Sequence, residues 1–368
     1  MRIGIFGAGQ LGRMLASAGY PLGHTFLLYD SSGTPCPGAG ELMVDTQHEQ
    51  LEEFLAQVDR ISFEHEHLDP KTLARMTDVA NLYPSLAALK LGQNRGLEKS
   101  LFTQLEIPVP RYFLASSLED LRAGLGTFTF PCIAKTVHGG YDGRGQMILR
   151  CAEDALTAWQ ELREQALIVE EFVDFEREIS VIACRDRKGH IQFYAPSENR
   201  HKNGILRFSI APAPQLSQEN IALAKRYITR LLERLDYVGV LALELFVTPQ
   251  GLLANEMATR VHNSGHWTMG GALTSQFENH IRAVADQALG ATDTLGVSCM
   301  INLIGDYGDI DALLALPFAR VHLYGKDPRP GRKLGHVNVI ADNYESLYAR
   351  VNACLALMAE PARFEMPA

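Results

Sequence analysis

The sequence predicts an α/β protein of two to three domains, and three observations favour this class. The first 63 residues alternate predicted apolar strands, at 2–7, 24–29 and 58–63, with helices, which is typical of a parallel sheet. A helix predicted over 86–105 is followed by Pro108-Val-Pro110, which indicates a domain boundary nearby. The length of 368 residues is more than one typical domain needs.

Beyond that boundary, the sequence predicts a smaller α+β unit over residues 111–183 and a larger mixed region after it. The predicted strands lie at 129–135, 146–149, 166–173, 240–247, 252–256, 299–304, 320–324 and 337–340, and the predicted helices lie at 152–164, 218–235 and 344–358. We find no internal repeat and no low-complexity tract.

The composition excludes several classes of protein. A hydrophobic content of 46% and a charged content of 21% are typical of a globular chain, and no apolar run is long enough to span a membrane. The net charge of −9 argues against non-specific binding to nucleic acid or to an anionic membrane. No secretory or transit segment is recognisable, so we expect a cytoplasmic protein. The six cysteines are scattered without a Cys-x-x-Cys pair.

Two glutamates on a predicted hairpin are the strongest functional signal. Thr248-Pro249-Gln250-Gly251 is predicted as a turn, and pairing Thr248 with Leu252 would set Glu244 opposite Glu256. Two buried carboxylates facing each other need a cation or a shared proton, and a hard ion such as Mg²⁺ meets that need. If the register slips by one residue, one of them merely faces solvent. These strands alone leave both interpretations open.

Two glycine-rich segments have competing interpretations. Gly7-x-Gly9-x-x-Gly12, with Asp30 after the next strand, matches a dinucleotide-binding fingerprint, but it also suits a tight strand-to-helix turn whose amides face an anion. The second interpretation is favoured, because no later segment looks like a hydride-transfer site. Lys135 precedes the loop 139–145, whose amides could face phosphate oxygens; the alternative is a mobile surface hairpin.

Two further polar clusters follow the carboxylates. Arg260-Val-His-Asn-Ser-Gly-His266-Trp267 is either a helix-capping loop or a substrate site, and a metal site at His262 and His266 lacks the glutamate of a His-Glu-x-x-His motif. Residues 326–333 form the one basic cluster, in a Pro/Gly-rich loop. A phosphate contact suits this loop better than a nucleic-acid signal does in an acidic protein.

Taken together, these motifs resemble the ATP-grasp enzymes, and among them the 5-(carboxyamino)imidazole ribonucleotide synthases of purine biosynthesis. The resemblance covers nearly the whole chain. It is carried by residues 7–14, 139–146, 252–267 and 329–333. It implies the three-domain ATP-grasp architecture with a Rossmann-like N-terminal domain, which we divide at residues 1–98, 99–183 and 184–368.

The resemblance also implies roles for individual residues. The nucleotide site would take Arg95, Lys135, Gly140, Tyr141, Asp142, Gly143, Arg144, Gly145, Gln146, Glu170, Glu171, Phe172, Val173, Glu178, His201, Asn255 and Glu256. The reacting groups would be held by Tyr141, Asp142, Arg144, Arg260, His262 and Asn263, and the ribonucleotide by Gln10, Glu66, Lys326, Arg332 and Lys333. Glu244 and Glu256 would bind Mg²⁺ or Mn²⁺.

The implied reaction is the ATP-dependent carboxylation of 5-aminoimidazole ribonucleotide by bicarbonate through carboxyphosphate. The partners would be these small molecules and a second copy of the chain, with no nucleic acid and no membrane. The alternatives are another ATP-grasp ligase or transformylase and, with less support, an NAD-binding oxidoreductase. One departure is Phe63-Glu64-His65-Glu66, where the histidine is unusual and the roles of Glu64 and Glu66 stay open.

Overall fold

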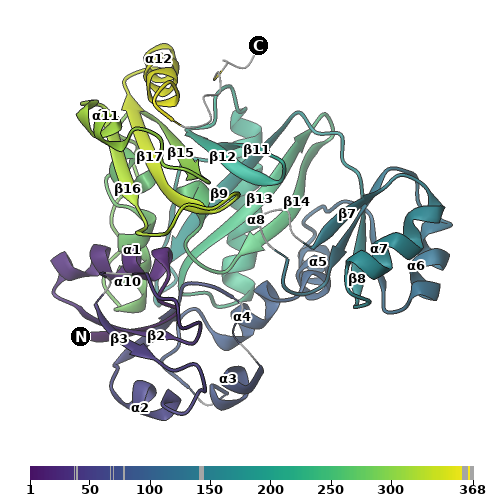
Figure 1. Ribbon diagram of the computed structural model, residues 1–368, viewed down its shortest axis with the longest axis horizontal. Coiled ribbons are helices and arrows are strands. Elements are labelled where there is room, and N and C mark those ends of the chain that lie inside the picture. The colour runs from purple at the N-terminus through teal and green to yellow at the C-terminus, as the bar shows by residue number, and fades with distance from the viewer. Residues whose placement is uncertain are drawn as a thin grey trace.

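Three sheets organise the chain in the computed structural model (Figure 1). The structure describes residues 1–36, 38, 40–66, 68, 70–77, 79–140, 145–358 and 364. Among these residues, no helix is both long and apolar enough to cross a membrane.

The N-terminal sheet is parallel, with the strand order β3-β2-β1-β4. Its elements are β1 (Arg2–Phe6), α1 (Gln10–Gly19), η1 (Tyr20–Leu22), β2 (Thr25–Asp30), β3 (Glu41–Val44), α2 (Leu51–Ala56), β4 (Arg60–Phe63) and α3 (Pro70–Arg75). The predicted strands and first helix are confirmed. The edge strand β3 was not predicted, because its apolar run of Leu42 to Val44 is too short to stand out from the surrounding polar and glycine-rich residues.

Two helices lead from this sheet to the next. They are α4 (Leu86–Gly92) and α5 (Arg95–Gln104), where the sequence predicted one continuous helix. Ser85 caps α4 and Asn94 caps α5, each with a side-chain oxygen that accepts a backbone N–H. The second cap explains the break, because Asn94 has extended backbone angles that a continuous helix would not allow.

The middle sheet is antiparallel, with the order β5-β8-β6-β7. Its elements are β5 (Tyr112–Ala115), α6 (Leu118–Leu125), β6 (Cys132–Thr136), β7 (Gln146–Leu149), η2 (Ala152–Asp154), α7 (Ala155–Glu161) and β8 (Leu167–Glu171). Its buried residues form a cluster drawn entirely from this segment, including Leu121, Leu149 and Val169. The unit therefore has a core of its own and lies to one side of the molecule (Figure 1).

The third sheet has nine strands along the main order β14-β13-β9-β11-β12-β15-β17-β16, with β10 beside β9. Its region comprises β9 (Arg177–Arg185), β10 (Ile191–Phe193), β11 (Ser197–Lys202), β12 (Ile205–Ala211), α8 (Gln218–Arg234), β13 (Gly239–Thr248), β14 (Gly251–Ala258), η3 (Asn263–Gly265), α9 (Thr268–Gly271), α10 (Gln276–Val284), β15 (Val297–Ile304), α11 (Ile310–Ala315), β16 (Ala319–Leu323), β17 (Lys333–Ala341) and α12 (Tyr344–Leu355). Strand β9 runs across the boundary expected at residues 183 and 184, and the three-domain division at these positions stays a proposal.

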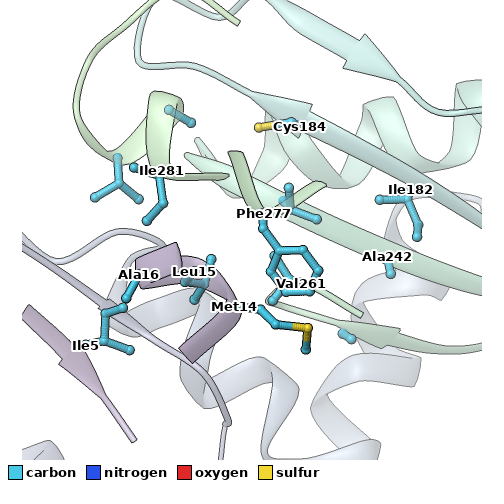
Figure 2. Packing of buried hydrophobic residues seen from close by; sticks show 14 of the residues in the cluster. Ile5, Met14, Leu15, Ala16, Ile182, Cys184, Ala242, Val261, Phe277 and Ile281 are labelled. Carbon is cyan, nitrogen blue, oxygen red and sulfur yellow. The ribbon is translucent and has the colours of Figure 1, made fainter. Parts of the chain in front are cut away.

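The N-terminal unit is fixed to the large sheet by a shared core. Figure 2 shows Met14 and Leu15 of α1 next to Phe277 and Ile281 of α10, and all four side chains are buried. Burying an aliphatic or aromatic side chain of this size contributes about 1.5–3 kcal/mol each. The first and third regions therefore form one packed body, from which the middle unit extends.

Candidate active site

The two glutamates of the hairpin lie opposite each other, as the sequence predicted. Glu244 of β13 pairs with Glu256 of β14, so both carboxylates lie on one face. The predicted register is nevertheless wrong at the turn, because Thr248 pairs with Gly251 and not with Leu252. The register shifts next to Glu244, where Asn255 is the extra residue of a bulge, and this shift restores the glutamate pair.

Each carboxyl group of the pair disfavours the ionisation of the other when no cation is bound. Burial and the neighbouring Glu256 raise the pKa of Glu244 to about 8. Neutral His262 Nε2 lies 3.5 Å from Glu244 Oε1, and the Arg95 guanidinium, through Nη2, lies 3.6 Å from Glu256 Oε2. Among the described residues no group of three or more His, Cys, Asp or Glu could hold a metal. A hard cation here would thus take two protein carboxylates and complete its shell with water or phosphate oxygens, as Mg²⁺ commonly does.

A cavity of about 320 Å³ lies between the middle unit and the large sheet, beside the glutamates. Several of the residues expected at a nucleotide line it: Arg95, Lys135, Gln146, Glu178, His201, Asn255 and Glu256. Burial opposes protonation of His201, but Glu178, whose Oε2 lies 3.2 Å from His201 Nδ1, raises the pKa of His201 overall. Glu170, Glu171, Phe172 and Val173 are not among the described lining residues.

Glu170 is engaged inside the protein. Its Oε2 accepts a bond from Lys135 Nζ at 2.5 Å, and its Oε1 lies 3.1 Å from Lys99 Nζ. Although burial works in the opposite direction, the two ammonium groups hold the pKa of Glu170 down at about 2. The carboxylate therefore balances lysine charge behind the cavity.

A second cavity, of about 420 Å³, adjoins the first. Among the expected residues it is lined by Gln10, Glu66, Arg95, Gly140, Glu256, Arg260, His262, Asn263 and Lys333. It is also lined by Glu64 and His65, whose roles the sequence left open, and by Glu98 and Tyr324, which the sequence did not single out. The two cavities share Arg95, Glu256, His262, Asn263 and Lys333. A ligand in one cavity can therefore meet a ligand in the other at this shared wall.

The polar residues of the shared wall are held by defined contacts. His262 Nδ1 lies 2.8 Å from Ser264 Oγ, and burial together with Arg260 lowers the pKa of His262 well below its ordinary value, which keeps the ring neutral. Asn263 and Asn302 exchange two amide hydrogen bonds, at 3.2 and 2.7 Å. His266 lies 3.1 Å from the Gln276 amide, so it is held within the loop and is not poised with His262 around a metal.

The basic loop and the glycine-rich loop are placed only in part. Lys326 Nζ donates to Gln10 Oε1 at 2.6 Å, and Arg332 Nη1 donates to the Asp327 carbonyl, so neither lines the cavity directly. Gly140 borders the second cavity and Gln146 the first, with Gly145 just before Gln146. Tyr141, Asp142, Gly143 and Arg144 lie outside the described residues.

The structure settles what the N-terminal glycines do. Gly9 N and Gly12 N both donate to the Glu64 carboxylate at 2.6 Å. A Cβ at Gly7 would lie 2.3 Å from Glu64 Cγ, and one at Gly9 would lie 2.5 Å from Glu64 Oε1. The glycines thus admit an internal carboxylate, which occupies the place of a dinucleotide phosphate. The NAD interpretation is not supported.

Comparisons with known proteins agree with this geometry. Residues 1–93 match the ribonucleotide synthetase preATP-grasp domain, residues 100–277 the ATP-grasp domain, and residues 298–350 the phosphoribosylaminoimidazole carboxylase C-terminal domain. The N5-carboxyaminoimidazole ribonucleotide synthase of Pseudomonas aeruginosa is 42% identical over 97% of this chain and 99% of its own length. The chain belongs to the N5-carboxyaminoimidazole ribonucleotide synthase family.

Solved structures of N5-carboxyaminoimidazole ribonucleotide synthases match over nearly the full length. The Thermus thermophilus synthetase is 44% identical, with a TM-score of 0.92 over 99% of this chain and 100% of that one. The Aspergillus clavatus enzyme, in complex with ADP and 5-aminoimidazole ribonucleotide, is 25% identical, with a TM-score of 0.88 over 97% of this chain and 98% of that one. The predicted α/β class and ATP-grasp architecture are confirmed.

Sequence reasoning missed two ionisable residues beside this synthase site, Glu98 and Lys99, and it left the role of Glu64 open. Glu98 Oε1 accepts from Met257 N at 2.5 Å, and Lys99 Nζ donates to the Asn255 carbonyl at 2.7 Å. Arg95, Glu98 and Lys99 fall at positions i, i+3 and i+4 of α5 and so share one helix face. That spacing was available in the sequence, and a charged face on a helix with buried members could have indicated these contacts.

Proposed function

We propose that the chain carboxylates the exocyclic amine of 5-aminoimidazole ribonucleotide with bicarbonate, using ATP and forming N5-carboxyaminoimidazole ribonucleotide, ADP and phosphate in purine biosynthesis. The observation that carries this proposal is the pair of adjoining cavities with a shared polar wall next to two opposed glutamates. A nucleotide in one and a ribonucleotide in the other would bring the γ-phosphate close to the amine.

The first cavity suits ATP. Lys135 and Arg95 bring positive charge to the phosphate end, and Glu178 with His201 offers polar groups for the ribose. Phosphoryl transfer depends mainly on positioning and charge neutralisation, which these groups supply. The expected adenine contact along residues 170–173 would be made by the backbone at the end of β8, since the Glu170 side chain is taken by lysines.

The opposed glutamates suit Mg²⁺, with Mn²⁺ as the alternative ion. Glu244 and Glu256 would hold it. Two carboxylate ligands suit a hard divalent cation better than one carboxylate and one histidine would. When bound, the ion supplies charge neutralisation to the phosphates during transfer. Arg95, beside Glu256, would keep that carboxylate aimed at the ion.

The second cavity suits the ribonucleotide and bicarbonate. Arg260 is held by Glu66, whose Oε2 accepts from Arg260 Nε at 2.6 Å, so its guanidinium is fixed in orientation. Neutral His262 and Asn263 would hold the reacting carbonate group at the shared wall, and Lys333 would face the ribonucleotide side. Carboxyphosphate hydrolyses readily, and the glycine-rich segment 139–146, of which Gly140 borders the second cavity and Gln146 the first, would exclude water.

A coupled assay tests the function. The protein is mixed with ATP, Mg²⁺, bicarbonate and 5-aminoimidazole ribonucleotide, and ADP release is followed. We expect release that requires the ribonucleotide and bicarbonate together. Formate in place of bicarbonate, and an amino acid in place of the ribonucleotide, test the other ATP-grasp acceptors. ADP release with no dependence on the ribonucleotide would refute the proposal.

We also propose that the protein acts in the cytoplasm as a homodimer, as the sequence and the family resemblance suggest. Light scattering on the purified chain would test the second part, with a mass of about twice 40.7 kDa expected.

A further inference from the structure

One buried lysine, Lys99, lies behind the nucleotide cavity and has no role in the function proposed above. Its side chain is 1% exposed, and it does not line either cavity. Its Nζ lies 3.1 Å from Glu170 Oε1, 2.7 Å from the Asn255 carbonyl and 3.2 Å from the Ala254 carbonyl. These acceptors come from β8 of the middle unit and from β14 of the large sheet.

The contacts of Lys99 require a charged ammonium. Nζ donates hydrogen bonds to two carbonyls, and the third oxygen near it, Glu170 Oε1, belongs to a buried carboxylate whose charge an ammonium balances and a neutral amine does not. Burial lowers the pKa of Lys99, and the Glu170 carboxylate opposes that shift. A buried charge persists where it is both paired and hydrogen-bonded, and this one is both.

Glu170 is shared between two lysines of unlike exposure. Lys135 also contacts its carboxylate, at 2.5 Å, and Lys135 is the one that lines the nucleotide cavity. The group of two ammonium ions and one carboxylate has a net charge of +1. Without Lys99, the carboxylate would cancel the Lys135 charge, and the group would offer a nucleotide no net charge.

The same lysine also holds the bulge in β14. Asn255 is the extra residue that restores Glu256 to the face of Glu244, and the Asn255 carbonyl is bound by Lys99. A shift of one residue in a strand sends its side chains to the opposite face. Lys99 thus contacts both the phosphate-binding lysine group and the strand of the proposed metal ligands.

We propose that Lys99 is a positioning residue of the nucleotide site: it balances Glu170 so that the charge of Lys135 is available to the ATP phosphates. This inference rests on the ATP-dependent function proposed above. Lys99 acts through Glu170 and Lys135 and does not itself touch the nucleotide.

The test compares Lys99→Met with the double variant Lys99→Met/Glu170→Gln. We expect the single variant to raise the KM for ATP by about tenfold or more, while the KM for 5-aminoimidazole ribonucleotide changes little. The double variant restores a net charge of +1 at Lys135, so the KM for ATP should return to within about threefold of wild type. Lys188→Met removes the same charge from an exposed turn after β9 and should change neither constant.

The outcomes separate this inference from the function. If the wild type releases no ADP in response to the ribonucleotide, the proposed function fails. If the wild type is active and Lys99→Met leaves the KM for ATP unchanged, the inference is overturned. It is also overturned if the double variant has a higher KM for ATP than the single variant, because a purely structural role of Lys99 predicts that the second substitution adds damage. If the single variant does not fold, the double variant decides alone, and an ATP KM far above wild type contradicts the inference.

Discussion

Two pairs of glutamates in this molecule have opposite surroundings. In the N-terminal unit, Glu64 accepts bonds from Gly9 N and Gly12 N, and Glu66 accepts bonds from Thr259 N at 3.2 Å and Arg260 Nε at 2.6 Å. On the hairpin, Glu244 and Glu256 face each other, with the neutral His262 ring 3.5 Å from Glu244 and the Arg95 guanidinium 3.6 Å from Glu256. The first pair is satisfied by the fold and the second is not.

The difference shows that burial alone does not mark a functional carboxylate. Glu64, Glu66 and Glu244 are all less than a tenth exposed. What separates them is whether N–H donors of the protein already neutralise the charge, which is the usual condition for a buried ionised group. The hairpin pair would be neutralised by a bound cation, whereas Glu64 is satisfied within the N-terminal unit and Glu66 joins that unit to the loop after β14.

The largest expected effect comes from removing charge from the unsatisfied pair. Glu256→Gln keeps the shape of the side chain but removes one of two carboxylates proposed for Mg²⁺. We expect turnover to fall by orders of magnitude, because charge neutralisation at the phosphates depends on that ion. Steady-state ADP release measures it, and thermal unfolding should show the fold intact. Turnover near that of the wild type would contradict the metal role of Glu256.

Removing a member of the satisfied pair should act on stability first. Glu66→Ala leaves the buried Arg260 guanidinium without its partner, which should lower the free energy of unfolding by about 3–5 kcal/mol. Urea unfolding followed by the fluorescence of buried Trp267 measures the change. The matched control is Glu41→Ala, whose partner Arg2 forms an exposed pair that should contribute less than about 1 kcal/mol. Equal losses of stability in the two variants would contradict the expected difference between the Glu66–Arg260 pair and the exposed Glu41–Arg2 pair.

A smaller effect is expected from the glycine turn that Glu64 fills. In Gly9→Ala, the new Cβ would lie 2.5 Å from Glu64 Oε1 and would push the carboxylate off its two amide donors. The loss should be about 1–3 kcal/mol. Gly126→Ala is the control, because that position has ordinary helical angles and no Cβ contact under 3.3 Å. The comparison is made by urea unfolding. A Gly9→Ala protein as stable as Gly126→Ala would show that the turn accommodates a methyl group without displacing the Glu64 carboxylate.

The glutamate comparison also shows what sequence reasoning can reach. The facing of Glu244 and Glu256 was predicted from local turn chemistry, yet the true register at Thr248 differs and a bulge at Asn255 compensates. A single bulge changes the alternation of apolar and polar residues along a strand too little to be recognised in one sequence. The Asn255 carbonyl accepts a hydrogen bond from Lys99, which is far away in the chain, so the residues near the bulge do not reveal this contact.

The same limit applies to Glu64 and Glu170. The sequence indicated an anion at the N-terminal glycines, and the structure supplies one from residue 64 of the same chain. Glu170 was expected at the adenine, whereas its carboxylate pairs with two lysines. Strands β1, β2 and β13 were predictable because their apolar runs are buried, while side-chain partners depend on tertiary packing that a single sequence does not display.

The smallest effect concerns Glu98, a third buried carboxyl beside the unsatisfied pair, in the protein without nucleotide or divalent ion. Burial, together with Glu256, raises the pKa of Glu98 to about 8. Below about pH 4.5 the group is protonated in both the folded and the unfolded chain. As pH rises from there to about 8, the unfolded chain loses the proton first, so stability falls, and above pH 8 the full cost is present.

Glu98→Gln removes that titration. The stability of Glu98→Gln relative to wild type should therefore increase with pH, by about 1 kcal/mol between pH 7 and pH 8. Urea unfolding at several pH values measures it, with Glu119→Gln on the exposed first turn of α6 as the matched control. A difference that stays constant with pH would mean that Glu98 is ionised in the folded protein. It would then belong with Glu64 and Glu66 as a carboxylate satisfied by the fold, through its bond from Met257 N.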